Sequence, residues 1–305
     1  ANRLVPIISV SDAKFCWNST YTNFHCRKAE LGQFKQAAIW GIEAGYHHID
    51  TAAIYGNEHE IGDAIAEKVD QGLVSREQLF VTTKLWNDCH LESNVVPALK
   101  DSLKRLKLQY VDLYLIHWPF SNNKGEDTAI DYLETWKGME KAVELGLTLS
   151  IGVSNFNKQQ LERLINNCKI KPAVNQIEIN PTLTRKELVS YCISQSVVPV
   201  AYTPLGLVSD ARPEFAHLDA IKTDPKLGHI AQKYGKTRAQ VTLRYLIQRD
   251  IAVIPKSFTK SRIEDNLNIF DFELNKSEME VLDGFDINHH CVPATPFKHF
   301  TNYPF

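Results

Sequence analysis

The sequence lacks the features that a membrane protein or a nucleic-acid-binding protein would show. No apolar run approaches the roughly 20 residues that a membrane-spanning helix requires, so we predict no membrane segment. The charges nearly cancel, because 34 basic and 36 acidic residues give a formal net charge of −2. A chain without an excess of positive charge has no general attraction to nucleic acid or to anionic lipid. We therefore predict neither nucleic acid nor a membrane as a partner.

Recurrent cysteine and glycine motifs are also missing. The six cysteines are scattered, without a Cys-x-x-Cys pair, and in a chain of 305 residues this is typical of reduced thiols in a cytoplasmic protein. We expect no secretory signal peptide, although a start at Ala1 is compatible with a removed segment. No Gly-x-Gly-x-x-Gly pattern occurs, which argues against a doubly wound dinucleotide-binding sheet. We also expect no metal site and a monomeric protein.

Strand-like and helix-like segments alternate along the chain, and the hydrophobic content of 44% is enough for a large core. The strand-like runs are almost continuously apolar, which predicts burial on both faces of a sheet. Eight strand–helix units in about 270 residues favour a closed (β/α)₈ TIM barrel. We expect a single domain over residues 1–305, with residues 286–305 as a C-terminal substrate loop over the barrel mouth. The expected strands are 6–10, 46–50, 79–85, 111–117, 149–154, 173–179, 197–202 and 251–254, and the expected helices are 31–44, 57–69, 95–106, 132–145, 158–166, 185–195, 225–234, 237–248 and 263–268.

Polar or aromatic residues lie near or just beyond the carboxyl ends of seven of the eight expected strands. In a barrel, side chains at the carboxyl ends of the strands converge on one mouth, where the chemistry takes place. Each of these residues alone has a simpler explanation, such as a helix cap, a core tyrosine or a solvated lysine. Their common placement favours a functional site. The residues are Asp50, Tyr55, Lys84, His117, Ser154, Asn155, Gln176, Tyr202, Lys256 and Ser257.

The first four of these residues can be assigned chemical roles. A tyrosine hydroxyl can donate a proton to a developing alkoxide, but its ordinary pKa of roughly 10 makes it slow at neutral pH. A lysine beside Tyr55 would lower that pKa, and Asp50 can supply the anion that a buried Lys84 needs. His117 can orient a carbonyl oxygen by donating from a ring nitrogen. Since no side chain donates hydride, the set indicates carbonyl reduction with a nicotinamide cofactor.

The remaining strand-end residues suit that cofactor. The hydroxyl and amide groups of Ser154, Asn155 and Gln176 are suitable partners for a carboxamide, and Tyr202 offers a flat face to a nicotinamide ring. Lys256 and Arg262 lie just before an expected helix, and phosphate groups bind well at the start of a helix beside cations. Two cations there favour NADP over NAD. A solvated basic loop is the alternative explanation for this last segment.

Several segments together resemble the aldo-keto reductase family, in its aldose and aldehyde reductase branch. The resemblance runs from about residue 31 to the end of the chain. The matching segments are 45–52 (GYHHIDTA), 83–86 (TKLW), 112–119 (DLYLIHWP), 150–156 (SIGVSNF), 175–178 (NQIE), 201–206 (AYTPLG) and 254–257 (IPKS). Segments 132–136, 167–174 and 303–305 are similar to insect members, some of which reduce ecdysteroid ketones.

The resemblance implies an NADPH-dependent reductase of aldehydes and ketones, in which Asp50, Tyr55, Lys84 and His117 form a catalytic tetrad with Tyr55 as general acid. We expect substrate contacts from Trp86, His117 and Trp118; a core position is the alternative for the two tryptophans, but each of them lies close to a tetrad residue in the sequence. The contacts that the resemblance implies for NADPH come from Ser154, Asn155, Gln176, Tyr202, Thr203, Leu205, Lys256, Ser257, Phe258, Arg262, Asp265 and Asn266. A second interpretation is a nicotinamide-binding regulatory or sensor protein with incidental turnover, as some barrel relatives are.

The sequence also departs from the family pattern. Residues 11–30 replace a short first loop that borders the cofactor and the substrate, so we expect an unusual pocket. Asp265 stands where the family more often has Glu, and its shorter side chain puts the adenine contact in doubt. The loop of residues 120–131 is short and should open one wall of the pocket. Aromatic walls at Trp86 and Trp118, with Val292 and Pro293 nearby, favour bulky or hydrophobic carbonyl compounds.

Overall fold

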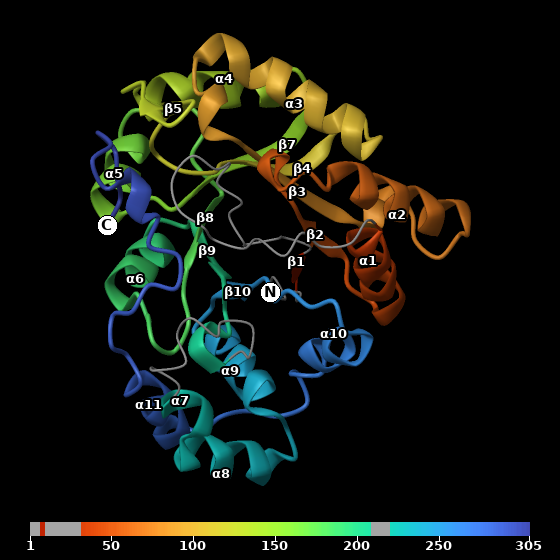
Figure 1. Ribbon diagram of the computed structural model, residues 1–305, viewed down its shortest axis with the longest axis vertical. Coiled ribbons are helices and arrows are strands. Elements are labelled where there is room, and N and C mark those ends of the chain that lie inside the picture. The colour runs from red at the N-terminus through yellow and green to blue at the C-terminus, as the bar shows by residue number, and fades with distance from the viewer. Residues whose placement is uncertain (1–6, 10–31, 209–219) are drawn as a thin grey trace.

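The computed structural model describes residues 7–9, 32–208 and 220–305. Eight parallel strands form one sheet in the order β1-β2-β3-β4-β7-β8-β9-β10. The sheet curls, and the helices lie around its outside (Figure 1). The strands are β1 (Ile7–Ser9), β2 (His48–Asp50), β3 (Phe80–Leu85), β4 (Val111–Ile116), β7 (Thr148–Ser154), β8 (Val174–Glu178), β9 (Val198–Tyr202) and β10 (Ala252–Val253). An α/β barrel-like fold, as predicted, is therefore present.

Helices connect successive strands at nearly the predicted positions. The helices that follow the strands in turn are α1 (Gln33–Ala44), α2 (Glu58–Asp70), α3 (Glu92–Leu106), α4 (Tyr132–Glu144), α5 (Lys158–Ile165), α6 (Lys186–Ser194), α7 (Ala220–Thr223), α8 (Pro225–Tyr234), α9 (Arg238–Ile247), α10 (Lys260–Leu267) and α11 (Lys276–Asp283). Within the described residues, no helix combines the length and the apolar character that a membrane span requires.

Strand β4 shows why the strands read as continuous apolar runs. Leu113 and Leu115 belong to a small apolar cluster with residues of β8, β9 and β10, inside the curled sheet. Tyr114 and Ile116 belong to the larger cluster that packs the sheet against helices α1 to α5. Successive side chains of a strand point to opposite faces of the sheet. Since both faces of β4 are covered by apolar clusters, all six of its residues are buried. Burial on both faces confirms the interpretation of these runs.

Three parts of the chain differ from expectation. The short helix α7 was not predicted, since no expected helix covers residues 220–223. Helix α11 was not predicted, although Asn275 and Glu278 form a capping box in which each side chain accepts from the other residue's backbone N–H. The predicted loop 120–131 contains a short hairpin of β5 (Asn122–Asn123) and β6 (Glu126–Asp127). Lys124 and Gly125 between these strands both have positive φ, as a tight hairpin turn requires. The predicted first-loop segment 11–30 lies outside the described residues.

Helix α2 approaches the end of α3 so closely that it depends on a glycine. A Cβ on Gly62 would lie 2.5 Å from the backbone oxygen of Leu106 and 2.9 Å from that of Arg105. We expect Gly62→Ala to lower the free energy of unfolding by about 1–3 kcal/mol, because rigid backbone atoms must move. Urea titration checks this. Gly284→Ala is the control, since its nearest atoms lie at an ordinary 3.4 Å, and an equal loss in both variants would contradict the prediction.

Candidate active site

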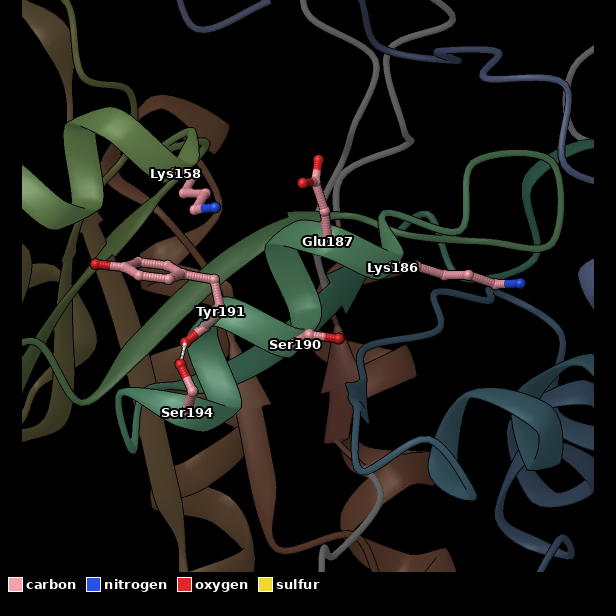
Figure 2. Close-up of a pocket in the computed structure, with 6 residues that line it drawn as sticks. All are labelled: Lys158, Lys186, Glu187, Ser190, Tyr191 and Ser194. Carbon is pink, nitrogen blue, oxygen red and sulfur yellow. Dashed lines mark hydrogen bonds between the residues drawn. The ribbon is translucent and has the colours of Figure 1, made fainter.

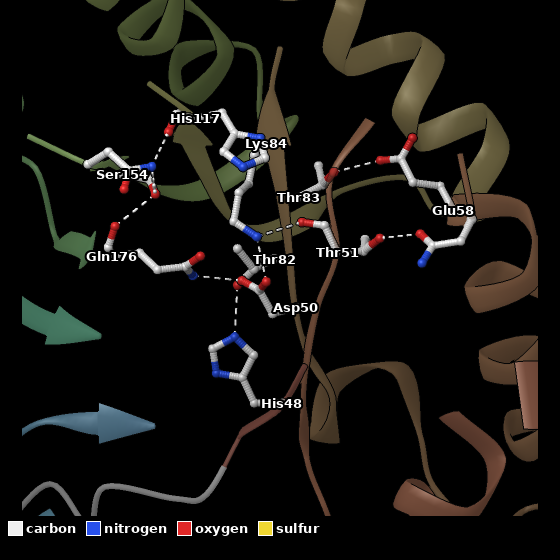
Figure 3. A network of polar contacts seen from close by, with 12 residues as sticks. His48, Asp50, Thr51, Glu58, Thr82, Thr83, Lys84, His117, Ser154 and Gln176 are labelled. Carbon is white, nitrogen blue, oxygen red and sulfur yellow. Dashed lines mark hydrogen bonds and ion pairs between the residues drawn. The ribbon is translucent and has the colours of Figure 1, made fainter. Parts of the chain in front are cut away.

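The curled sheet brings polar residues in or just after six strands to one network, and Figure 3 shows the part of it formed by Asp50, Lys84, His117, Ser154 and Gln176. Asp50 is the last residue of β2, Lys84 is the next to last of β3, and His117 directly follows β4. Ser154 ends β7, Gln176 lies in β8, and Tyr202 ends β9. The predicted convergence of these residues is therefore present, although the sequence separates the first and last by about half of the chain.

A buried ion pair forms the base of the network. Lys84 and Asp50 have side chains that are 0% and 1% exposed. The ammonium group of Lys84 donates to Asp50 Oδ1 and to the carbonyl oxygen of Thr51, the latter at 3.0 Å. Gln176 Nε2 donates to the other carboxylate oxygen, Asp50 Oδ2, at 2.8 Å. Each charge is therefore matched by a partner, as burial away from water demands.

Burial and pairing act in opposite directions on Lys84. Burial lowers the pKa of the Lys84 ammonium below its ordinary value, although the nearby carboxylates of Asp50 and Glu58 oppose this by raising it. Burial, and then repulsion by Lys84, lowers the pKa of His117 well below its usual range. His117 is therefore a neutral imidazole with a hydrogen on one ring nitrogen, which can donate to a carbonyl oxygen without carrying a charge.

Tyr55 approaches the ion pair from the loop after β2. It is half-buried and ends a 3₁₀ turn, η1 (Ala53–Tyr55). Its ring meets the ring of His117 edge-on, at a centroid distance of 5.7 Å. The Lys84 nitrogen lies 5.3 Å from the centre of the Tyr55 ring. The four residues predicted as a tetrad thus lie together, and their contacts suit proton donation by a phenol beside a cation.

The predicted carboxamide-binding residues are joined to one another. Ser154 Oγ donates to the carbonyl oxygen of Gln176 at 2.7 Å. Asn155 Nδ2 donates to the carbonyl oxygen of His117 at 2.9 Å, while its Oδ1 accepts from the hydroxyl of Tyr202 at 2.7 Å. Asn155 and Thr203 both have positive φ, of 64° and 48°, which non-glycine residues adopt at some energetic cost. Strain of this kind is concentrated at functional sites.

The predicted phosphate residues lie before α10 and in its first turn, and the predicted adenine residues lie near its end. Lys256 and Arg262 are exposed, and the Lys256 nitrogen lies 4.1 Å from the centre of the Phe258 ring. Ser257 Oγ accepts from the backbone N–H of Thr259 at 3.0 Å. Farther along, Asp265 is exposed, Asn266 is buried and Leu205 is half-buried. These positions suit an extended ligand.

The predicted substrate walls differ in their exposure. Trp86 is half-buried and lies edge-on to His117 at 5.2 Å. Trp118 is only 2% exposed and packs against Phe120 and Phe305. It therefore lies within an aromatic cluster, and little of its surface is open to solvent.

One residue of the site was not assigned from the sequence. The buried carboxylate of Glu178 accepts from the backbone N–H groups of Cys291 and Val292, at 2.8 and 3.1 Å. It thereby attaches the C-terminal segment to β8, two residues beyond Gln176. Side chains two residues apart in a strand point to the same face, so Gln176 and Glu178 point to the same side of β8. The spacing Gln-x-Glu could therefore have predicted that Glu178 lies beside the site.

The outer helix layer carries a separate hollow, between α5 and α6, with a volume of about 470 Å³ (Figure 2). Its walls contain none of the predicted site residues. The lining residues are Lys158, Lys186, Glu187, Ser190, Tyr191 and Ser194.

Comparison with known proteins gives a consistent result. The Aldo/keto reductase family model matches residues 36–287. Aldo-keto reductase AKR2E4 of Bombyx mori is 49% identical over 276 residues, which cover 90% of this chain and 89% of that protein. Its crystal structure in complex with NADP has a TM-score of 0.91 and covers 99% of this chain and 95% of that chain, at 44% identity. Aldo-keto reductase AKR2E5 complexed with NADPH has a TM-score of 0.87 at 44% identity, covering 91% and 85% of the two chains.

Two desolvated histidines make the stability of the fold depend on pH. Desolvation lowers the pKa of the partly buried His48 and of the fully buried His90 to about 3, whereas an unfolded histidine titrates at roughly 6.5. The unfolded chain therefore binds more protons, and the free energy of unfolding should fall as the pH drops below 6.5 toward 3. Each such histidine contributes about 1.4 kcal/mol per pH unit in this window.

Urea titrations between pH 7.5 and 5 measure this slope. His90→Phe should reduce it, because that side chain no longer titrates. His59→Asn is the control, since His59 is exposed, and its slope should equal that of the wild type. A His90→Phe slope identical to the wild type would contradict the prediction.

Proposed function

The chain belongs to the aldo-keto reductase family, and we propose that it is an NADPH-dependent reductase of aldehydes and ketones. The observation that carries this proposal is the buried Lys84–Asp50 pair, with Tyr55 and His117 in contact above it. A sensor with incidental turnover would not need these four groups to be assembled. Relatives named as reductases, two of them crystallised with NADP or NADPH, also support an NADP-dependent oxidoreductase.

The residues present fit the cofactor. Hydroxyl, amide and aromatic groups from β7, β8 and β9 meet at one place, which suits a nicotinamide carboxamide and its ring. We propose that Ser154, Asn155, Gln176, Tyr202 and Thr203 hold this end. Leu205 would lie along the pyrophosphate, and the residues near α10 would hold the adenosine end: Lys256, Ser257, Phe258 and Arg262 at the 2′-phosphate, and Asp265 and Asn266 at the adenine.

Bound NADPH supplies a hydride to the carbonyl carbon. The chain supplies the proton: the Tyr55 hydroxyl transfers its hydrogen to the carbonyl oxygen, so that an alcohol forms and the phenol becomes a phenolate. The Lys84 ammonium, 5.3 Å from the ring centre, stabilises that negative charge. Neutral His117 donates a hydrogen bond that orients the carbonyl oxygen. Water then returns a proton to Tyr55.

The substrate is proposed from the walls of the site. Trp86, half-buried beside His117, presents aromatic surface, which favours bulky, hydrophobic carbonyl compounds over free sugars, whereas Trp118 is almost fully covered by its aromatic neighbours. Ketones of the ecdysteroid type belong to this class. We further propose that the sheet closes between β10 and β1 into a full barrel, that residues 1–305 form one domain, and that residues 286–305 cover its mouth, held by Glu178. The cytoplasmic location and the monomeric state stay predictions.

We expect Tyr55→Phe to lower kcat at least about 100-fold, because general acid catalysis contributes roughly 10²–10⁴-fold. The dissociation constant of NADPH should change less than about twofold. Loss of nicotinamide absorbance with aromatic aldehydes, quinones and ketosteroids measures turnover, and fluorescence titration measures binding. Tyr191→Phe on the outer helix α6 is the matched control. Wild-type turnover by Tyr55→Phe would reject the general acid, and tight NADPH binding without turnover by the wild type would favour the sensor.

We expect Lys256→Ala combined with Arg262→Ala to weaken NADPH binding at least about tenfold, because two charge-assisted hydrogen bonds to the 2′-phosphate are lost. NADH, which lacks that phosphate, should be affected much less. Titration of both cofactors gives the ratio. Lys276→Ala, an exposed cation on α11, is the control for net charge. Equal losses for NADPH and NADH would reject the assignment.

A further inference from the structure

A second buried carboxylate lies on the outer side of β3, away from the reacting groups. Glu58, the first residue of α2, is fully buried. One of its oxygens accepts from Thr83 Oγ1 at 2.6 Å, and the other accepts from Arg105 Nε at 2.7 Å (Figure 3 shows the contact with Thr83). The two donors come from β3 and α3. Glu58 therefore joins three elements at a single point, and each of its oxygens has a donor.

The same cluster touches the strand that carries Lys84. Thr83 directly precedes Lys84, and adjacent strand residues point to opposite faces. Thr83 thus faces the helix layer and meets Glu58, while Lys84 faces the site and meets Asp50. Because Glu58 is the first residue of α2, its bond to Thr83 fixes the start of α2 relative to the backbone of Lys84.

Tyr55 lies three residues before Glu58, in a loop that is fixed at both ends. At its start, Thr51 donates from its backbone N–H to Thr82 at 2.9 Å, and its carbonyl oxygen accepts from the Lys84 ammonium. Thr51 Oγ1 also donates to Asn57 Oδ1 at 2.8 Å, across the loop. At its end stands Glu58. Both ends of the loop that carries Tyr55 are therefore anchored to β3 and to the start of α2.

We propose that Glu58, Thr83 and Arg105 form a positioning cluster that sets the placement of the Tyr55 hydroxyl relative to Lys84. This inference rests on the proposed function. The cluster touches no reacting atom and acts through the backbone between Gly56 and Glu58. Proton transfer is sensitive to such placement, because a misplacement of about 1 Å can lower a rate 10²-fold.

Electrostatics adds to this role. The Glu58 carboxylate is one of the charges that raise the pKa of the Lys84 ammonium against the effect of burial. Other titratable groups that face Lys84 are Tyr55, whose ring centre lies 5.3 Å from its nitrogen, and Asp50 on β2, which also raises its pKa. Lys84 in turn lowers the pKa values of His48 and His117. Arg105, with a side chain 40% exposed, covers Glu58 from solvent.

The test uses substitutions at Thr83, because valine keeps the shape of threonine and removes only its hydroxyl. We expect Thr83→Val to lower kcat at least about tenfold, with the NADPH dissociation constant within about twofold of the wild type. The solvent deuterium isotope effect on kcat should rise, because proton transfer from a displaced Tyr55 becomes slower. Thr83→Ser restores the hydroxyl and should return both values close to the wild type.

The matched control is Lys107→Ala. Its ion pair with Asp63 also joins α3 to α2, but both side chains are largely exposed, so kcat and the isotope effect should stay unchanged. If Thr83→Val does not fold, Arg105→Gln replaces it under the same criteria, since Arg105 is at the surface. A folded Thr83→Val or Arg105→Gln protein with a lower melting temperature but wild-type kcat and isotope effect would overturn the positioning role. A wild type without turnover on any carbonyl compound would overturn the proposed function itself, which is a distinguishable result.

Discussion

Lys84 and Asp50 form an ion pair that is buried inside the curled sheet. The other groups of the site are arranged around this pair. A buried ammonium loses its hydration, and burial lowers its pKa; without a carboxylate at hydrogen-bonding distance it would be neutral or would draw water inward. The carboxylate in turn is held by an amide from β8, 126 residues away along the chain. Three strands thus contribute to one charge arrangement.

The alternation of side chains along a strand connects this arrangement to the outside of the molecule. On β3, Lys84 faces the site while Thr83 faces α2 and binds Glu58. On β4, the side chains alternate between the inner apolar cluster and the helix layer. Packing in the helix layer is therefore connected through β3 to groups on the inner side of the sheet. The same physical rule explains why almost every residue of these strands is buried.

Much of this organisation could be predicted because it follows from local patterns. Continuous apolar runs predicted the doubly buried strands, and the polar residues after them predicted which side chains would meet. Helix α11 shows the opposite case, since its capping box at Asn275 and Glu278 was a local signal in the sequence, but no helix was predicted there. The hairpin at 122–127 depends on two positive φ angles, and only Gly125 of the two residues involved favours that conformation by itself.

The amino-acid sequence by itself determined the strand and helix periods, the residue types at the strand ends and the similarity to one enzyme family. Tertiary structure decided the contacts that give those residues their properties: the amide of Gln176 on Asp50, Glu58 between two donors, and Glu178 on the backbone of the C-terminal segment. The physical reason is that hydrogen bonds and desolvation act over a few ångströms in space. Sequence spacing states how far apart two residues are along the chain, and only the curvature of the sheet determines which of them lie within that range.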